Sequence, residues 1–346
     1  MANPSPRILI VRLSAIGDVL HALPVLNALR DALPNAFIAW VVEGRAADLL
    51  RGHQALNELV ELRRGWLKSP PTVWKLRKRL RRGRFDITVD VQGLTKSAIA
   101  AWLSPAPQRI GFDGPDGREL SRWLNNCLVQ PTAAHVIDRN LELLRALNIT
   151  AASVRFDLPE AQADAAAAEA AIAASALQSG FAVINPGAGW PSKLWPADRY
   201  AAVARHLGST RRLPSMVAWA GNQERQWALQ IVDGSAGHAR LAPATTLTQL
   251  AALLRRARLF IGSDTGPLHL AVAVGAPSVG LFGPMPAERN GPYGPQHLAV
   301  QKICLSGSSR QRRGAGPESM EAIEASAVIE ACESILERPL PATRCA

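Results

Sequence analysis

The sequence predicts an α/β protein made of two doubly wound, Rossmann-like domains that face a central cleft. Three observations lead to this prediction. The chain has 346 residues, too many for one ordinary hydrophobic core and suitable for two domains of roughly 150 residues each. Short apolar runs alternate with amphipathic stretches of about 10–15 residues, a pattern typical of βαβ units around a parallel sheet. The pattern stops near residues 157–160 and then starts again, so we expect one domain over residues 1–160 and a second over 161–346.

In the first domain, runs rich in Ile, Leu and Val indicate buried strands, and segments with helical periodicity separate them. The expected strands are residues 7–13, 37–42, 59–62 and 86–91. The expected helices are residues 19–32, 46–50 and 73–82. This order predicts a parallel sheet with helices between its strands.

The second domain repeats the alternation after an alanine-rich helix. The expected strands are residues 181–185, 215–219, 258–262 and 277–281. The expected helices are residues 161–177, 197–207, 222–232, 247–256 and 266–274, with a closing amphipathic helix over 320–336. Ligands of open α/β sheets bind at the carboxyl ends of the strands, so we expect the functional residues there in both domains.

Composition excludes several classes of protein. With 48% hydrophobic and 19% charged residues, the chain is globular rather than disordered. No apolar run approaches the ~18 residues of a membrane-spanning helix, and the first residues indicate a strand rather than a signal peptide. The cysteines are far apart and form no Cys-x-x-Cys pair, which predicts reduced thiols in a cytoplasmic protein, neither a zinc site nor a disulfide framework; they are Cys127, Cys304, Cys332 and Cys345.

Positive charge is concentrated in one segment of the first domain. The chain has a formal net charge of +11, and residues 63–84 contain ten basic residues and no acidic one. A solvated helix face is the usual explanation for such a run. However, uncompensated charge repels itself and is stabilised by an anionic partner. Composition leaves nucleic acid, a membrane surface and a phosphorylated substrate open.

The first motif with chemical content is Ser-Ala-Ile-Gly-Asp-Val-Leu-His over residues 14–21, at a strand-to-helix turn. Gly17 permits close approach, and Asp18 stands at a helix start, where the dipole keeps a carboxylate ionised and suited to act as a general base. Asp is also a common capping residue, and in isolation capping is the favoured interpretation. The turn lacks the Gly-x-Gly-x-x-Gly of a dinucleotide site.

A second turn, Gly-Ser-Asp-Thr-Gly-Pro-Leu-His over residues 262–269, has the same position in the second domain. Asp264, Thr265 and Gly266 lie where helix amides point at an incoming anion. The alternative is a helix cap with His269 packed in the core. Capping alone does not require Asp, Thr, Gly and His together, so the motif favours a binding site.

Two further loops follow strands of the second domain. The Gly/Pro loop of residues 185–196 carries Lys193, which in that position can reach a diphosphate, although a loop lysine is usually solvated. The turn of residues 219–224 carries Glu224, which can accept hydrogen bonds from a ribose diol or simply begin a helix. No Asp-x-Asp pair or metal-spaced His/Cys cluster accompanies them, so we expect no metal.

Together these segments resemble the heptosyltransferase family (glycosyltransferase family 9). Four stretches carry the resemblance: Ser-Ala-Ile-Gly-Asp-Val-Leu-His-Ala-Leu-Pro (14–24), Asp-Val-Gln-Gly-Leu-Thr-Lys-Ser-Ala (90–98), Asn-Pro-Gly-Ala-Gly…Lys-x-Trp-Pro (185–196) and Ser-Asp-Thr-Gly-Pro-Leu-His-Leu-Ala (263–271). The first two are closer to heptosyltransferase I than to II. The 185–196 loop is of a more general family type.

The resemblance implies a GT-B fold and an inverting, metal-independent transfer of heptose or a related sugar from an ADP-sugar to an anionic lipopolysaccharide inner-core acceptor. It also implies a cytoplasmic enzyme in peripheral contact with the inner membrane. It assigns catalysis to Asp18 and Lys193, and donor binding by the second domain to Gly187, Lys193, Glu224, Thr245, Asp264, Thr265, Gly266 and His269. It assigns acceptor binding by the first domain to Ser14, Gly17, Arg63, Arg64, Gly93, Lys96, Arg118 and Arg139.

Two other classes compete with this interpretation. A basic nucleic-acid-binding protein on a Rossmann scaffold would explain the 63–84 run but neither the 185–196 nor the 263–271 motif, and the sequence carries no recognised nucleic-acid motif. A GT-B protein that binds a sugar nucleotide without catalysis would explain the second domain. The intact Asp18 argues against it. We therefore expect a nucleotide-sugar donor and a glycolipid acceptor as partners, and no nucleic acid.

Overall fold

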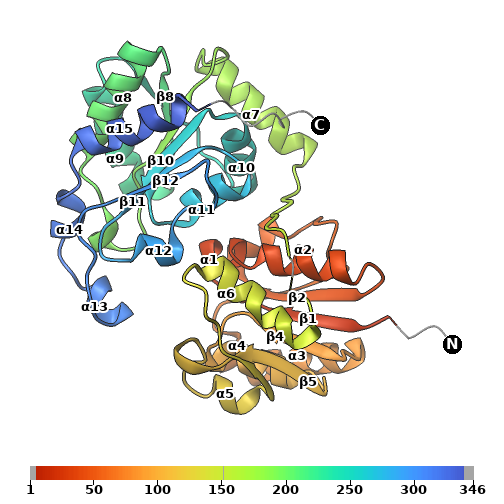
Figure 1. The fold of residues 1–346 in the computed structure, drawn as a ribbon. Coiled ribbons are helices and arrows are strands. Elements are labelled where there is room, and N and C mark those ends of the chain that lie inside the picture. Colours follow the sequence, from red (N-terminus) through yellow and green to blue (C-terminus); the bar gives the residue numbers. More distant parts are fainter. Residues whose placement is uncertain (1–4, 151, 339–346) are drawn as a thin grey trace. The chain divides into compact units, whose positions relative to one another are not determined.

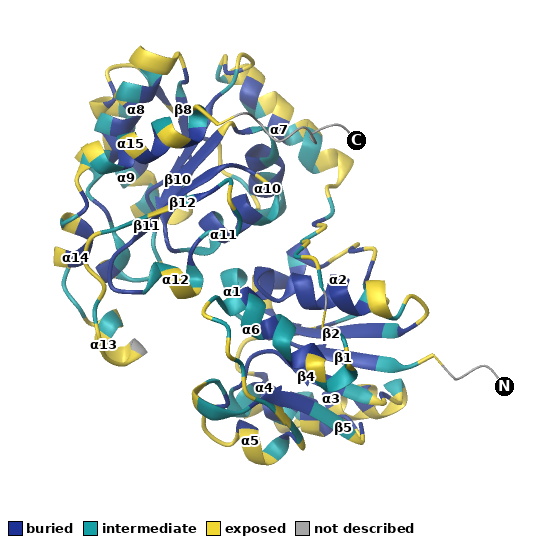
Figure 2. Cartoon of the chain, in the orientation of Figure 1, coloured by how far each residue is buried: buried dark blue, intermediate teal, exposed yellow. Residues whose placement is uncertain are grey.

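The computed structural model describes residues 5–150 and 152–338. The chain divides into two compact units, the first ending at Pro159 and the second beginning at Glu160. Each unit contains one six-stranded, wholly parallel sheet covered by helices (Figure 1). The central strands of both sheets are almost wholly buried, as Figure 2 shows in dark blue. These findings confirm the prediction of two doubly wound α/β units.

In the first unit the strand order is β3-β2-β1-β4-β5-β6. β1 is central and pairs in parallel with β2 and β4, so that Ile8 lies opposite Ile38 and Ile87. The strands are β1 (Arg7–Val11), β2 (Phe37–Glu43), β3 (Glu58–Leu62), β4 (Ile87–Asp90), β5 (Gln108–Phe112) and β6 (Cys127–Val129). The order reverses direction at β1, which is the switch point where such folds bind ligands.

The helices of the first unit form two layers. Because parallel crossovers are right-handed, the connections from β1 to β3 and those from β3 to β6 cover opposite faces of the sheet. α2 (Leu23–Ala32) packs with α6 (Val136–Glu142) on one face, near the 3-10 helix η1 (Gly44–Leu49). On the other face α4 (Thr95–Leu103) contacts both α3 (Pro70–Gly83) and α5 (Ser121–Leu124). Leu76 and Leu80 of α3 are buried, one turn apart, in the core beneath that layer.

In the second unit the order is β12-β11-β10-β7-β8-β9. The strands are β7 (Ala182–Asn185), β8 (Ser215–Val217), β9 (Ala239–Leu241), β10 (Leu259–Ser263), β11 (Ser278–Phe282) and β12 (Leu298–Gln301). The helices are α7 (Gln162–Ala174), α8 (Ala197–Arg211), α9 (Gly221–Gly234), α10 (Leu247–Arg256), α11 (Gly266–Ala273), α12 (Ala287–Asn290), α13 (Ser309–Arg313), α14 (Glu318–Glu321) and α15 (Ala325–Leu336). In the described part of the chain, no helix is long and apolar enough to span a membrane.

Several elements differ from the sequence-based expectation. The sequence did not predict β6 and β9. They have three residues each, too few to show the alternation of apolar and polar residues that marks a strand. The helix expected over 19–32 is two helices, α1 (Ile16–Leu20) and α2, because Pro24 stands in the first turn of α2 and has no N–H with which to continue α1. The closing helix expected over 320–336 is also divided, into α14 and α15. The Ile323 carbonyl at the break accepts from Trp195 Nε1 at 2.9 Å and from Arg199, which replaces its helical hydrogen bond.

Candidate active site

Asp18 is the third residue of the short helix α1 (Ile16–Leu20), which begins soon after β1. Its Oδ2 accepts a hydrogen bond from the Ala15 amide at 3.0 Å, so the side chain does satisfy a backbone donor at the helix start. Its Oδ1 lies 2.7 Å from Nη2 of Arg12, yet the side chain remains 45% exposed. The carboxylate therefore closes the helix and is still accessible to a ligand. Ser14 and Gly17, both half-buried, belong to the same turn.

Arg12 is the residue of this turn that sequence analysis missed. It is only 7% exposed, and its Nη1 donates to the Val91 carbonyl at 2.5 Å. The guanidinium thus connects the carboxyl ends of β1 and β4 while its other nitrogen holds Asp18. An arginine next to an apolar strand gives no signal in the sequence that its guanidinium is buried and pairs with Asp18.

The loop after β4 is built around a buried carboxylate. Burial raises the pKa of Asp90, whose Oδ1 accepts from the amides of Gln92 at 3.1 Å and Gly93 at 3.2 Å. Gln92 in turn accepts from the Leu13 amide at 2.8 Å, which ties this loop to the turn of Asp18. Gly93 has φ +66°, and a Cβ there would lie 2.3 Å from the Asp116 carbonyl. The position therefore requires glycine.

The other predicted acceptor residues follow the carboxyl ends of neighbouring strands or join loops that do. Lys96 forms an ion pair with Glu43, the last residue of β2. Arg139 on α6 pairs with Asp116 at 2.5 Å. The amide of Arg118, in the loop after β5, donates to the Gly93 carbonyl at 2.9 Å. Arg63 and Arg64 are exposed directly after β3. Parallel strands end at one edge of the sheet, so the structure brings these residues to the same edge as Asp18.

In the second unit, Lys193, Asp264 and His269 form one buried cluster. Lys193 Nζ lies 2.5 Å from Asp264 Oδ2 and 3.1 Å from its carbonyl oxygen. His269 Nε2 lies 3.1 Å from Oδ1, and since an ionised carboxylate only accepts, Nε2 carries the proton. Burial by itself raises the pKa of Asp264, but the His269 hydrogen bond and the Lys193 charge outweigh it, so the pKa lies below its ordinary value. Asp264 therefore serves as the anchor of Lys193.

The amino end of α11 lies beside this cluster. Thr265 is the N-cap residue, with φ −147° and ψ 172°, and its hydroxyl donates to the Ser263 carbonyl at 3.2 Å rather than capping the helix. Gly266 begins the helix, and Pro267 occupies its first turn. The helix start thus combines a dipole and amides suited to an anion with the ammonium group of Lys193.

Glu224 and Gly187 are in direct contact. A Cβ at Gly187 would lie 2.3 Å from the Glu224 carboxyl carbon, so a larger residue there would displace this carboxylate. Glu224 Oε2 accepts from the Ala220 amide at 2.8 Å. Burial raises the pKa of Glu224. The carboxylate is thus held at the start of α9 beside the loop that carries Lys193.

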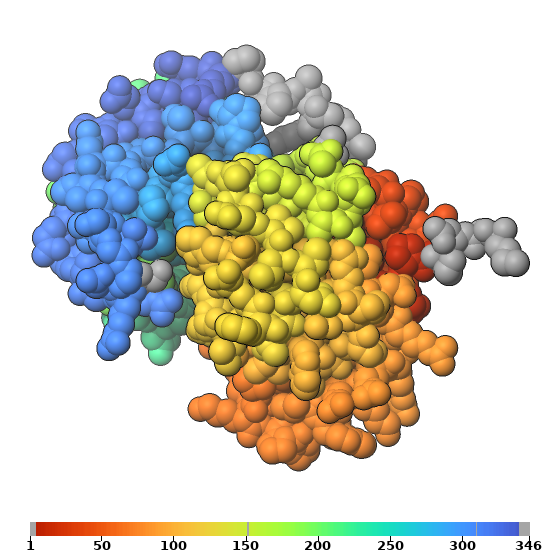
Figure 3. Space-filling view, turned by 60° about the horizontal axis from the view of Figure 1, so that its bottom comes forward, coloured from red at the N-terminus to blue at the C-terminus, as the bar shows by residue number. Residues whose placement is uncertain are grey.

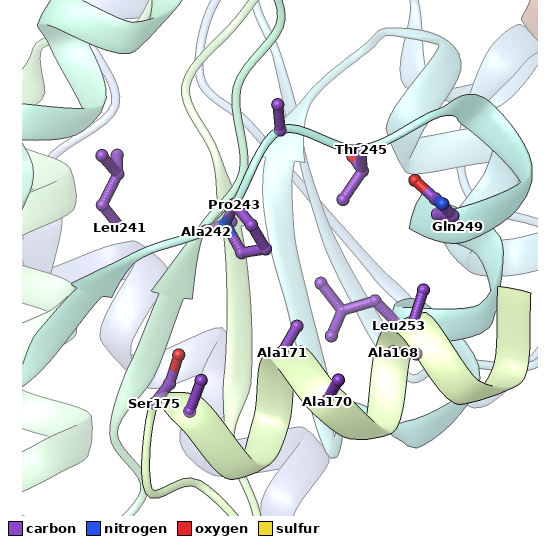
Figure 4. Close-up of a pocket in the computed structure, with 13 residues that line it drawn as sticks. Ala168, Ala170, Ala171, Ser175, Leu241, Ala242, Pro243, Thr245, Gln249 and Leu253 are labelled. Carbon is purple, nitrogen blue, oxygen red and sulfur yellow. The ribbon is translucent and has the colours of Figure 1, made fainter.

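Thr245 lies in the loop between the carboxyl end of β9 and α10. It lines an apolar pocket of about 640 Å³. Figure 4 shows alanines of α7, among them Ala168 and Ala171, on the opposite wall from Pro243 and Thr245. Gln249 and Leu253 of α10 also line the pocket.

Trp190 lies between Lys193 and Arg313, a residue that the sequence analysis did not indicate. Lys193 Nζ lies 4.3 Å from the centre of the indole ring, and the guanidinium carbon of Arg313 lies 4.6 Å from it. Arg313 is the last residue of α13, about 120 positions along the chain from Trp190. Only the folded chain brings it to this loop.

Both α/β units thus carry polar residues at the carboxyl ends of their strands, and comparison with known proteins specifies the class. Residues 73–315 match the family model of glycosyltransferase family 9 (heptosyltransferase). Because this match covers more than half of the chain, the protein belongs to glycosyltransferase family 9. The resemblance inferred from the sequence motifs is confirmed, and membership favours a glycosyltransferase over the two competing classes.

Curated relatives match over most of their length. Lipopolysaccharide heptosyltransferase 1 of Pseudomonas aeruginosa is 29% identical over 316 residues, which cover 86% of this chain and 85% of the relative. Lipopolysaccharide heptosyltransferase 1 of Escherichia coli K12 is 27% identical, with 85% and 93% covered. These relatives bear the name of the subgroup that the first two motifs indicated.

Solved structures agree on the fold. E. coli heptosyltransferase WaaC with ADP is 26% identical, has a TM-score of 0.74, and is matched over 95% of this chain and 99% of that chain. The glycosyltransferase family 9 structure from Veillonella parvula has a TM-score of 0.85 at 23% identity, with 97% and 98% covered. The chain therefore has the two-domain α/β architecture of GT-B enzymes. Within residues 5–150 and 152–338, no group of three His, Cys, Asp or Glu side chains could hold a metal ion.

Proposed function

We propose that this enzyme transfers heptose from ADP-heptose to an anionic inner-core acceptor of lipopolysaccharide, with inversion at the anomeric carbon and without a metal. On this proposal it is a cytoplasmic enzyme that works against the membrane holding its acceptor. The observation that carries the proposal is the buried cluster of Lys193, Asp264 and His269 at the start of α11. WaaC has been solved with ADP and with ADP-2-deoxy-2-fluoro heptose, which supports an ADP-sugar donor here.

The second unit supplies the positive charge for the donor. Lys193 is 11% exposed and fixed by Asp264, so little conformational freedom is lost when its ammonium group meets a diphosphate. The amides at Gly266 and the positive end of the α11 dipole also favour an anion at this helix start. These groups stabilise the negative charge that grows on the diphosphate as it leaves. They take the role that a metal ion has in other enzymes. Glu224 is the group proposed for the ribose hydroxyls.

The first unit supplies the base. Asp18 accepts the proton of the attacking acceptor hydroxyl, whose oxygen forms a bond to the anomeric carbon as the bond to the diphosphate breaks. One displacement of this kind inverts the configuration and requires one base. Arg12 fixes the carboxylate through Oδ1. The cations at the strand ends, Arg63, Arg64 and Lys96 among them, are the proposed binding groups for the acidic acceptor.

The test is a transfer assay with ADP-heptose and a delipidated inner-core acceptor, run with and without excess EDTA. We expect equal rates in both conditions, stoichiometric release of ADP, and a product with the anomeric configuration opposite to that of the donor, as read by NMR. Retention of configuration would refute the single displacement. Loss of activity on chelation that magnesium restores would refute the metal-independent mechanism.

A further inference from the structure

The outer face of the α3–α4–α5 layer combines positive charge with exposed aromatic side chains. α3 buries Leu76 and Leu80 and presents six cations to solvent. They are Lys75, Arg77, Lys78, Arg79, Arg81 and Arg82. Of these, Arg79 is paired, with Glu58. Within the described part of the chain, the other five take part in no salt bridge, so this charge is not neutralised by the protein itself.

Large exposed hydrophobic side chains collect on the same unit. Among the described residues seven stand out, and six of them belong to the first unit. These six are Leu67, Trp74, Trp102, Leu120, Trp123 and Leu128. Five of the six lie on or directly beside α3, α4 and α5, which form one layer over one face of the sheet. In Figure 3 the orange and yellow segments that contain these helices form one continuous part of the surface turned to the viewer.

Aromatic and cationic groups interleave on this layer. Trp74 on α3 is 61% exposed, and its ring lies 4.9 Å from Lys78 Nζ, one turn further along the helix. Trp102, at the end of α4, is 51% exposed. It lines a groove of about 250 Å³ together with Arg77 and Arg81 of α3 and with Arg109 of β5. Three guanidinium groups around a space of that size suit a phosphate group.

We propose that the outer face of α3, α4 and α5 docks on an anionic lipid bilayer. The cations attract lipid phosphates, the groove between Arg77, Arg81 and Trp102 receives a headgroup, and Trp74, Trp102 and Trp123 insert at the level of the headgroups. This deepens the proposed function by naming the surface through which the enzyme meets the membrane of its acceptor.

The chemistry favours a bilayer over nucleic acid. Tryptophan concentrates at membrane–water interfaces because its ring is apolar and its N–H is polar. A surface helix with Lys and Arg on its polar face, beside exposed Trp and Leu, is the combination that binds the interfacial plane. The residues involved are separate from Asp18, Lys96 and the other groups proposed to bind the acceptor sugars, so membrane docking and transfer can be measured independently.

The experiment uses the full-length enzyme without substrate and floats it with vesicles of phosphatidylcholine that either contain phosphatidylglycerol as the anionic lipid or contain none. We expect binding to the anionic vesicles alone. Each cation near such a surface strengthens binding about fivefold, so the triple variant Arg77→Gln, Lys78→Gln, Arg81→Gln should bind on the order of 100-fold more weakly. A matched control removes three exposed cations of the second unit, Arg205→Gln, Arg212→Gln and Arg240→Gln, and should retain most of the binding.

The aromatic part is tested by Trp74→Ala with Trp102→Ala. We expect a severalfold loss of vesicle binding, against no loss for Ile303→Ala, the exposed hydrophobic residue of the second unit. In every variant, thermal unfolding and transfer to a delipidated acceptor should match the wild type, which separates docking from folding and from catalysis.

Four results would overturn the proposal. The wild type could bind neutral and anionic vesicles equally, or the two triple variants could lose binding equally. Transfer to the delipidated acceptor could fall with the α3 variant, which would place these cations in the acceptor site. Tighter binding of duplex DNA than of anionic vesicles, abolished by the same variant, would assign the surface to nucleic acid. Vesicle binding without any sugar transfer would support the docking surface and contradict the proposed function.

Discussion

Asp18 and Asp264 occupy the same place in the two units and have opposite surroundings. Each lies after a strand that is paired on both sides, β1 or β10, and near the start of the next helix. Asp18 is the third residue of α1, and Asp264 comes just before the N-cap residue of α11. Asp18 is 45% exposed and bonded to one guanidinium and one amide. Asp264 is 6% exposed, and both of its oxygens are engaged by Lys193 and His269.

This difference shows that position in a Rossmann-like unit does not decide what a carboxylate does. An accessible carboxylate can exchange a proton with a substrate. A buried carboxylate with two cationic or donor partners fixes those partners instead, and its own protonation is suppressed. The comparison assigns chemistry to Asp18 and positioning to Asp264. Four variants test this assignment and the sites around the two carboxylates.

The largest effect is expected for Asp18→Asn. Loss of a general base lowers kcat on the order of 10²–10⁴-fold, and donor affinity should stay unchanged because the proposed donor groups belong to the second unit. The asparagine oxygen can still accept from the Ala15 amide, so the helix start is preserved. Steady-state kinetics with a calorimetric measurement of ADP affinity checks this. A kcat near that of the wild type would reduce Asp18 to a helix cap.

Asp264→Asn should instead destabilise the protein. Removing one partner of a buried ion pair costs about 3–5 kcal/mol, measurable as a lower free energy of unfolding in urea. Asp18→Asn serves as the exposed control and should lose much less stability. If both variants unfold at the same urea concentration, the contrast between the two carboxylates is wrong.

The pH dependence of the free energy of unfolding also follows from the surroundings of Asp264. The pKa of Asp264 is lowered in the folded state, so its contribution is complete above the unfolded pKa of about 3.9. It is lost as the pH falls through the lower folded pKa. The gap in stability between wild type and Asp264→Asn should therefore be constant above about pH 5 and shrink below about pH 4.

Lys193→Ala should weaken ADP binding and slow transfer together, because a cation on the diphosphate acts in both the ground state and the transition state. We expect kcat/KM to fall on the order of 10²-fold, the size seen when one group that stabilises developing charge is removed. Lys193→Arg is the conservative control. An unchanged kcat/KM in the alanine variant would show that Lys193 serves only Asp264.

The smallest effect is expected for Arg63→Glu with Arg64→Glu. Both side chains are exposed, and exposed charges each contribute about 1 kcal/mol or less, so acceptor KM should rise on the order of tenfold. ADP affinity should not change. Added salt should erode acceptor binding more than donor binding, because screening acts over about 8–10 Å on exposed charges and much less on the buried Lys193. If neither the substitutions nor added salt changes the acceptor KM, these arginines lie outside the acceptor site.

The sequence by itself determined the α/β class, the two-unit organisation and the turns that hold the proposed chemistry. Apolar periodicity is a local property, so strands such as β1 and β10 and helices such as α8 were evident from it. The motifs that contain Asp18, Lys193, Asp264 and His269 were found because each is contiguous in the chain and follows a strand.

Only the tertiary structure decided the partners of these residues. Arg12 meets Val91 across 79 positions, Lys193 meets Asp264 across 71, and Arg313 reaches the ring of Trp190 from α13. The division of the closing helix depends on Trp195, whose Nε1 donates a hydrogen bond to the carbonyl of Ile323, 128 positions further along the chain. Neither periodicity nor propensity encodes such contacts, because they depend on how strands are ordered in the sheet and on which loops that order brings together.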